Sequence, residues 1–214
     1  MHFNIIKISF IAILLLMINK VGYAFDVEVR KGDLIFQASA ATEFSKAINT
    51  SARQPSDSLT FCHVAIIDVD DCGRVYVIEA EPKNGVRRVP VEQFIAESVH
   101  ADGKPMVVVK RLTVPFSPDK VIANAMTFIG QDYDHEFMPD NDKMYCSELV
   151  YEAFLDEEGE HIFKATPMNF RNSNGEMPQF WIEKFGKMGV PIPEGELGTH
   201  PDALARTHFL ITIE

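Results

Sequence analysis

The chain has few cationic residues for its length. It carries 20 Lys and Arg against 31 Asp and Glu, which gives a formal net charge of −11 at pH 7. Such a surface would repel the phosphates of nucleic acid, so nucleic acid is not an expected partner. The excess of acid gives no positive evidence about a substrate, because acidic side chains often do no more than keep a surface solvated.

Common metal-binding and phosphate-binding motifs are missing as well. The sequence contains no CxxC or HExxH pattern and no glycine-rich phosphate loop. Cys62, His63 and Cys72 could be considered as a zinc cluster, but adjacent residues of a strand point to opposite faces, which argues against it. We therefore expect neither a metal nor a cofactor.

Long apolar runs are confined to the N-terminus. A lysine precedes the apolar run 8–18, and the small residues Gly22 and Ala24 follow at the spacing of a cleavage site. This order is typical of a secretory signal peptide, and the run is too short to span a bilayer comfortably. An uncleaved anchor is the alternative. We expect residues 1–24 to be removed and residues 25–214 to form a single exported domain, periplasmic or secreted, with no membrane span.

Cysteine is scarce too, with Cys62, Cys72 and Cys146 as the whole set. An odd number in an exported chain leaves at least one thiol outside any disulfide. Cys62 falls near the far end of a predicted strand and Cys72 in the loop that follows it. About ten extended residues span roughly 30 Å, whereas a disulfide needs Cα atoms within about 7 Å. We expect no disulfide.

The apolar patterns that are present predict an α+β domain with a mainly antiparallel sheet. Strands are expected over residues 34–37, 61–69, 75–80, 106–112 and 209–213. Helices are expected over residues 43–49, 91–99, 118–129, 143–157 and 178–188. The segment Asp70-Asp71-Cys72-Gly73 predicts a hairpin loop between the second and third strands. Ser117 is expected to cap the third helix and Gly130 to end it.

Cys146 lies at the start of a predicted helix. It begins a series of apolar residues at helical spacing that extends to Phe154, and Asn141 or Asp142 is expected to cap the first turn. The unpaired N–H groups of that turn and the positive end of the helix dipole would stabilise a thiolate, which is the nucleophilic form of cysteine. A buried cysteine without a catalytic role is the alternative.

His63 lies in an apolar strand. Strand alternation places it on the same face as Ala65 and Ile67, where a titratable ring needs a hydrogen-bond partner. A histidine held in the core is the ordinary interpretation. A catalytic role would require a thiol nearby and an acid that orients the ring.

Two glutamates of the following strand are candidates for that acid. A three-residue loop, 71–73, would place His63 opposite Glu81, and a shift by two residues would place it opposite Glu79. Both carboxylates then lie on the His63 face, and the one that is not directly opposite remains a diagonal neighbour. Glycine in the loop favours Glu81, while the deeper position in the strand favours Glu79.

Three motifs together resemble a known family. They are Gly32-Asp33-Leu34-Ile35-Phe36-Gln37, His63-Val64-Ala65-Ile66 and Tyr145-Cys146-Ser147-Glu148-Leu149-Val150-Tyr151, with Tyr133-Asp134 and Phe137 ahead of the cysteine. In this order they resemble the YaeF/YiiX branch of the NlpC-type papain-like superfamily, over residues 31–155. Ordinary papain-like enzymes have the cysteine before the histidine, so the reverse order indicates the circularly permuted branch. No motif is recognised after residue 160.

The resemblance implies a permuted papain-like fold, in which the helix carrying Cys146 packs on a small antiparallel sheet carrying His63. It also implies a third polar residue on the next strand, and Glu79 takes that position rather than Glu81. The implied activity is that of a cysteine amidase or peptidase, which cleaves a cell-wall peptide or related amide through a thioester. The backbone N–H of Cys146 and the side chain of Gln37 are candidate oxyanion donors.

Two alternatives remain open at this point. The same thiol chemistry would serve a lipid or other acyl thioesterase or an acyltransferase, since one fold supports several reactions. The other alternative is a non-catalytic domain that binds an envelope ligand.

Overall fold

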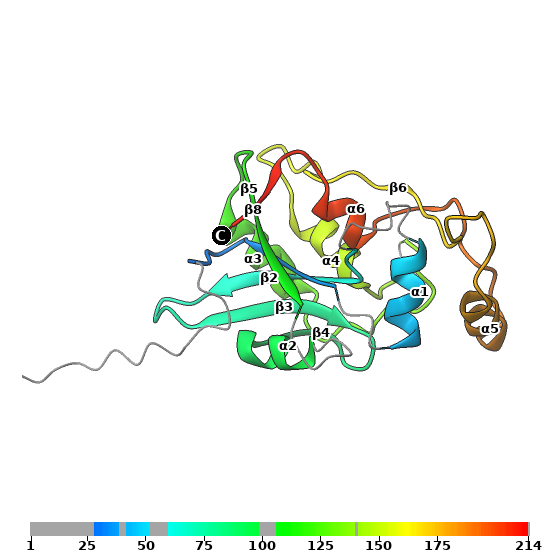
Figure 1. The fold of residues 1–214 in the computed structure, drawn as a ribbon. Coiled ribbons are helices and arrows are strands. Elements are labelled where there is room, and N and C mark those ends of the chain that lie inside the picture. Colours follow the sequence, from blue (N-terminus) through cyan, green and yellow to red (C-terminus); the bar gives the residue numbers. More distant parts are fainter. Residues whose placement is uncertain (1–27, 39–41, 52–59, 99–105, 140, 214) are drawn as a thin grey trace, which may run out of the picture.

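The computed structural model describes residues 28–38, 42–51, 60–98, 106–139 and 141–213. Its centre is a six-stranded sheet in the order β4-β3-β2-β1-β5-β8, and every neighbouring pair of strands is antiparallel (Figure 1). The strands are β1 (Leu34–Gln37), β2 (His63–Val69), β3 (Val75–Glu81), β4 (Gly85–Pro90), β5 (Val107–Leu112) and β8 (Leu210–Thr212). A separate short pair consists of β6 (Thr166–Pro167) and β7 (Leu197–Gly198).

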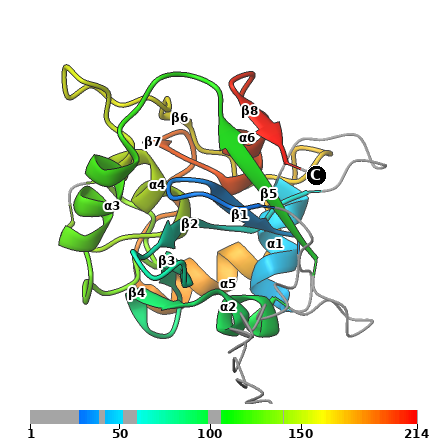
Figure 2. The same cartoon turned by 90° about the vertical axis from the view of Figure 1, so that its left-hand side faces the viewer.

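Helices cover both faces of the sheet (Figures 1 and 2). One core lies between the sheet and α2 (Val91–Glu97), and the other lies between the sheet and α3 (Pro118–Thr127) and α4 (Cys146–Ala153). The remaining helices add to the second core; they are α1 (Glu43–Ser51), α5 (Gln179–Met188) and α6 (Pro201–Ala205). The α+β class with an antiparallel sheet packed against helices is therefore confirmed.

Strand β2 shows how the apolar pattern divides between the two cores. Ala65 and Ile67 belong to the α2 core, whereas Val64 and Ile66 belong to the α4 core. Because successive side chains of a strand point to opposite faces, a strand buried on both sides is almost continuously apolar. The position of His63 at the beginning of β2 puts its ring at the end of the sheet rather than within either core.

The hairpin between β2 and β3 is present as predicted, and of the two registers considered it has the one with a three-residue loop. Val69 pairs with Val75, and the N–H of Asp70 donates to the carbonyl of Arg74, which leaves a loop of residues 71–73. Gly73 has a φ of 75°, as its place in the loop requires. Cys62, Cys72 and Cys146 form no disulfide; Cys72 is exposed in this loop, and the other two are buried.

Strand β4 is missing from the sequence-based prediction. Its two arginines, Arg87 and Arg88, weaken the apolar signal on which that prediction depends. Asn84-Gly85 at its start is nevertheless a strong hairpin signal, since both residues tolerate the backbone of a tight turn. Gly85 has a φ of 67°, and a Cβ added there would lie 2.1 Å from the carbonyl oxygen of Gln131.

The predicted cap and length of the cysteine helix are wrong. Helix α4 covers Cys146–Ala153 rather than residues 143–157, and its N-cap is Tyr145 instead of Asn141 or Asp142. The N–H of Tyr145 donates to the Glu148 carboxylate at 3.2 Å. The residues before Tyr145 cannot be helical because Met144 forms a β-bridge with Tyr133.

Helix α3 is confirmed at its start and corrected at its end. Ser117 is the N-cap and Pro118 the first helical residue, as predicted. The helix ends at Thr127, so Ile129 lies beyond it and is 40% exposed. The other expected elements agree within a few residues, whereas α6 and the β6–β7 pair were not predicted.

The proposed signal peptide, residues 1–24, lies outside the described residues. None of the helices in the described ranges combines the length and apolar character needed to cross a membrane.

Candidate active site

The ring of His63 lies between an acid and a thiol. Its Nε2 is 2.6 Å from Oε2 of Glu79, and the thiol of Cys146 is its other hydrogen-bond partner. Because Glu79 occupies Nε2, Nδ1 is the ring nitrogen that remains for the thiol. The ring also stacks on Phe94 of α2, with 5.7 Å between the ring centroids. The structure thus brings together Cys146, His63 and Glu79, the three residues selected from the sequence.

Glu79, and not Glu81, contacts the histidine. The β2–β3 register, extended to the strand end, would place His63 opposite Glu81, so Glu79 is its diagonal neighbour. Glu79 is only 2% exposed and directs Oε2 at the ring. Glu81 instead accepts hydrogen bonds from the backbone and side-chain amides of Asn84, at 3.0 and 2.6 Å. Its carboxylate therefore stabilises the β3–β4 turn.

Arg87 is the site residue that sequence reasoning missed. It lies directly opposite Glu79 on β4 and donates to Oε1 of Glu79 from Nε at 3.0 Å and from Nη2 at 2.7 Å. Nη2 also donates to Glu97 of α2 at 2.5 Å. Both oxygens of Glu79 are therefore engaged, which fixes the plane of the carboxylate against the His63 ring. The Asn84-Gly85 hairpin signal would have revealed the strand that carries Arg87.

The charges of this network favour a protonated histidine. Burial opposes a charge on His63, but hydrogen bonds to Cys146 and Glu79 outweigh it and raise the pKa of the imidazole to about 10. Burial likewise opposes a charge on Glu79, but the hydrogen bond and charge of His63, together with Arg87, lower the pKa of that carboxyl group. An imidazolium at neutral pH is the natural counter-ion of a cysteine thiolate.

Cys146 is the first residue of α4 and is 3% exposed. Its backbone N–H belongs to the first helical turn, where the helix itself supplies no carbonyl acceptor. A negatively charged atom at this position also meets the positive end of the helix dipole. The position predicted for Cys146 from the sequence is confirmed, although the helix begins later than expected.

A buried aspartate shapes the loop that leads to α4. Asp134 is fully buried, and its two carboxylate oxygens accept from the backbone N–H groups of Glu136 and Met138 at 2.8 and 2.7 Å. The adjacent Tyr133 pairs with Met144 just ahead of the cysteine. The Tyr133-Asp134 motif therefore acts on the backbone that positions Cys146.

A cleft lies beside His63, and a separate cavity lies beside Cys146. The cleft of about 380 Å³ is lined by His63 and Glu79 together with Gln37, Phe94 and Glu97. The smaller cavity of about 60 Å³ is lined by Cys146. Gln37 pairs with His63 across β1 and β2, and its side-chain amide reaches the carbonyl of Glu97 at 3.5 Å.

A thiol at a helix start, a histidine on an antiparallel sheet and an acid on the next strand define a papain-like site. The histidine precedes the cysteine along the chain, which is the permuted arrangement. The chain belongs to the family of permuted papain-like amidase enzymes described as YaeF/YiiX, C92 family, whose family model matches residues 28–213. The resemblance noted in the sequence is thereby confirmed.

Two YiiX proteins are similar to this chain. The uncharacterized protein YiiX of Escherichia coli strain K12 is 28% identical over 175 residues, which is 80% of each chain. The crystal structure of the metalloprotein YiiX from Escherichia coli O157:H7 superimposes with a TM-score of 0.68 at 26% identity. The match covers 86% of this chain and 96% of that one.

The metalloprotein description belongs to that YiiX structure. Within the described ranges of the present chain, no group of three or more His, Cys, Asp or Glu residues is arranged to hold a metal ion. The residues in these ranges therefore do not fit such a site.

Proposed function

We propose that the protein is an exported cysteine hydrolase that cleaves an amide bond in a cell-wall peptide or a related amide. Cys146 is the nucleophile, His63 the general base and acid, and Glu79 the residue that orients the ring. The observation that carries this proposal is the placement of one imidazole between the Cys146 thiol and the Glu79 carboxylate. Export is supported by the pattern of residues 1–24, and the NlpC-type relationship by the three motifs.

The chemistry follows from the arrangement of these groups. Nδ1 of His63 holds the proton given up by Cys146, and the thiolate of this ion pair attacks the carbonyl carbon to form a tetrahedral intermediate. The C–N bond then breaks as His63 gives its proton to the leaving amine, and a thioester to Cys146 remains. A water molecule, deprotonated by His63, attacks the thioester carbonyl. The carboxylic acid leaves and the thiol is restored.

The intermediate needs hydrogen-bond donors for its oxyanion. The backbone N–H of Cys146, in the first turn of α4, is the first donor. The side-chain amide of Gln37 is the proposed second donor, because Gln37 lies beside His63 and lines the same cleft.

A second candidate function is a thioesterase or acyltransferase that acts on lipid or other acyl groups. The cavity at Cys146 supports it, since it adjoins the nucleophile and would accept a short acyl group. The chemistry at the thiol would be the same, and the acyl group and the leaving group would differ.

The functions can be separated by their products. The mature protein is incubated with cell-wall peptides and with lipid substrates, and released amines and fatty acids are measured. We expect amine release that is lost in Cys146→Ser and in His63→Ala. Fatty-acid release instead would support the second candidate. Cleavage of neither substrate, together with binding of cell-wall peptide, would contradict both and support a binding domain. Export is tested separately by the N-terminus of the mature chain, which should be Phe25.

A further inference from the structure

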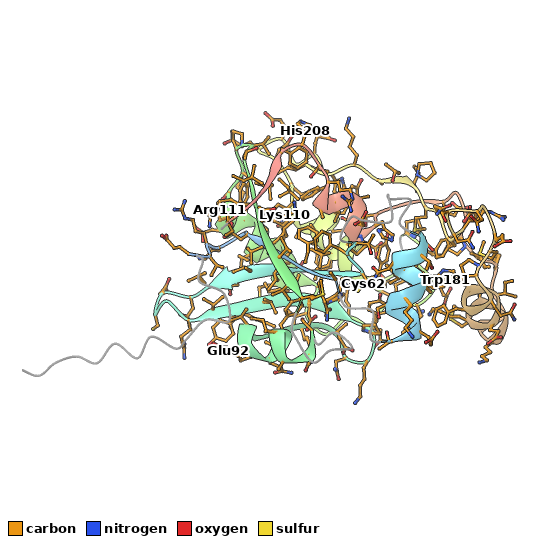
Figure 3. All side chains as sticks on the ribbon, in the orientation of Figure 1. Cys62, Glu92, Lys110, Arg111, Trp181 and His208 are labelled. Carbon is orange, nitrogen blue, oxygen red and sulfur yellow. The ribbon has the colours of Figure 1, made fainter. Side chains whose placement is uncertain are left out.

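The cavity beside Cys146 has features that the catalytic triad does not explain. Aromatic side chains from distant parts of the sequence meet in its wall, namely Tyr133, Phe137, Tyr145, Phe170 and Trp181. Trp181, labelled in Figure 3, belongs to α5 and meets Phe44 of α1 edge-on, with 6.0 Å between the ring centroids. The cavity is distinct from the larger cleft that His63 lines.

Four polar atoms of the cavity wall are buried without a hydrogen-bond partner among the described residues, namely Ser147 Oγ, Trp181 Nε1, Thr199 Oγ1 and His200 Nε2. The hydroxyl of Ser147 and the indole Nε1 of Trp181 are buried without a hydrogen bond, and their residues are 0% and 1% exposed. An unsatisfied buried polar group typically costs about 1–3 kcal/mol. Such groups are therefore normally completed by water or by a ligand. The indole N–H can only donate, so the missing partner must include a hydrogen-bond acceptor.

The rest of the wall indicates a neutral occupant. The residues that line the cavity, all within the described ranges, include no Asp, Glu, Lys or Arg. His200 is the titratable imidazole in the wall, and burial lowers its pKa, so its ring is neutral near pH 7. A buried charge without a counter-ion is strongly unfavourable. The occupant should therefore be polar but uncharged.

The volume limits the occupant further. A cavity of about 150 Å³ in another protein accepts benzene, with its six carbon atoms. By the same scale the 60 Å³ beside Cys146 holds roughly two or three non-hydrogen atoms. A long fatty acyl chain would not fit without a rearrangement of the aromatic wall.

The relative positions of Cys146 and His63 assign the cavity to one side of the scissile bond. His63 must protonate the leaving amine, so the amine lies on the side of the cleft that His63 lines. The acyl carbon is bonded to Cys146, which lines the small cavity. We infer that this cavity is the acyl subsite, and that it selects a compact, uncharged acyl group bearing a hydrogen-bond acceptor for Trp181 and Ser147. This inference rests on the proposed hydrolase function.

The binding step can be tested without turnover. Trp181 is the single tryptophan of the chain, so its fluorescence reports directly on the cavity. The Cys146→Ser protein is titrated with lactamide, with isobutyramide, in which a methyl group replaces the hydroxyl, and with hexanamide. We expect lactamide to shift the emission saturably and to bind at least about fivefold more tightly than isobutyramide, which corresponds to about 1 kcal/mol for one hydrogen bond. Hexanamide should give no saturable shift.

Two further variants make the assignment specific. Ser147→Ala in the same background should reduce the preference for lactamide over isobutyramide, because it removes one of the unpartnered polar groups of the wall. Ile182→Ala is the matched control, since Ile182 lies on α5, the helix that carries Trp181, and is 48% exposed; the preference should not change. Equal binding of lactamide and isobutyramide, or tighter binding of hexanamide, would overturn the inference. Because these titrations need no catalysis, that failure is distinguishable from an absence of amide cleavage, which would count against the proposed function.

Discussion

Glu79 and Glu81 lie two residues apart on one face of β3, yet their partners differ. Glu79 is held between His63 and Arg87, whereas Glu81 accepts from both amides of Asn84 at the following turn. In the proposed mechanism the charge on Glu79 orients the ring so that Nδ1 faces the thiol. Glu81 has no part in that step.

This difference predicts unequal effects of the same substitution. Glu79→Gln should lower kcat/KM for amide cleavage by roughly 10- to 150-fold, because a hydrogen bond to a charged group contributes about 1.5–3 kcal/mol. Glu81→Gln, the matched control, should change kcat/KM by less than about twofold, since an exposed partner contributes little. Steady-state kinetics of both variants provide the measurement. Equal losses, or a larger loss in Glu81→Gln, would show that the acid has been misassigned.

The residues of the site differ in how far the sequence could reveal them. Cys146 and His63 stand out locally, as a thiol at a helix start and a titratable ring in an apolar strand. The choice between the two glutamates needed the family resemblance, because strand register gives the directly opposite residue while the side chains here meet diagonally. Arg87 was missed because its contact with Glu79 depends on a strand that had not been predicted.

The β3–β4 turn is the element that places Arg87 opposite Glu79. Gly85, the first residue of β4 after this turn, has a positive φ and packs closely against the backbone of Gln131. The N–H of Val86 also donates to the carbonyl of Gln131 at 2.9 Å. The turn is therefore fixed both by its own conformation and by contact with the segment that follows α3.

A pair of glycine substitutions separates these two effects. Gly73→Ala should cost roughly 1–2 kcal/mol of unfolding free energy for the positive φ alone, because an added Cβ there meets no atom within 4 Å. Gly85→Ala should cost about 1–3 kcal/mol more, since its Cβ would overlap the Gln131 carbonyl. Urea denaturation of both variants gives the comparison. A cost for Gly85→Ala no greater than that for Gly73→Ala would mean that the close packing at Gln131 is absent.

Element boundaries were predictable where local signals set them. Ser117 and Pro118 start α3 through local capping chemistry, and the β2–β3 register follows from its loop. The start of α4 was misplaced because the bridge between Tyr133 and Met144 holds the preceding segment extended. That bridge joins segments eleven residues apart, and helical periodicity does not report it.

At the scale of the whole molecule, the charged site couples folding to pH. His63 has an ordinary pKa of 6.5 and a pKa of about 10 in the folded protein, so the folded state binds its proton more tightly. The contribution of His63 protonation to the free energy of unfolding is fully present below about pH 6.5 and is lost as the pH rises towards 10. This loss follows from the sign of the shift, because a raised pKa favours folding only while the group is protonated.

Thermal unfolding across that range tests the coupling. The difference in Tm between the wild type and His63→Ala should be largest near pH 6.5 and should shrink as the pH approaches 10. His161→Ala is a suitable control, because its ring pairs with Glu152 at 3.3 Å on the surface. A difference between wild type and His63→Ala that stays constant or grows with pH would contradict the charged state assigned to His63.

The C-terminal part of the chain, which has no recognised motif, contributes residues to the candidate site. No role could be given to Trp181 or His200 from the sequence, yet both line the cavity beside Cys146. Their position depends on the packing of α5 and α6 into the core that also contains α4. Contacts between segments so far apart in the sequence depend on the assembled fold. The candidate catalytic residues could therefore be predicted, while the proposed acyl subsite could not.

The central claim is that His63 activates Cys146, and thiol alkylation tests it most directly. Iodoacetamide is added at about pH 6.5, well below the ordinary thiol pKa of about 8.5, and the modified cysteines are mapped by mass spectrometry. We predict that Cys146 reacts faster than the exposed Cys72 despite its burial, and that His63→Ala removes this selectivity. A Cys146 that is inert in both proteins, or no faster than Cys72, would contradict the claim and make the thiol a core residue of a binding domain.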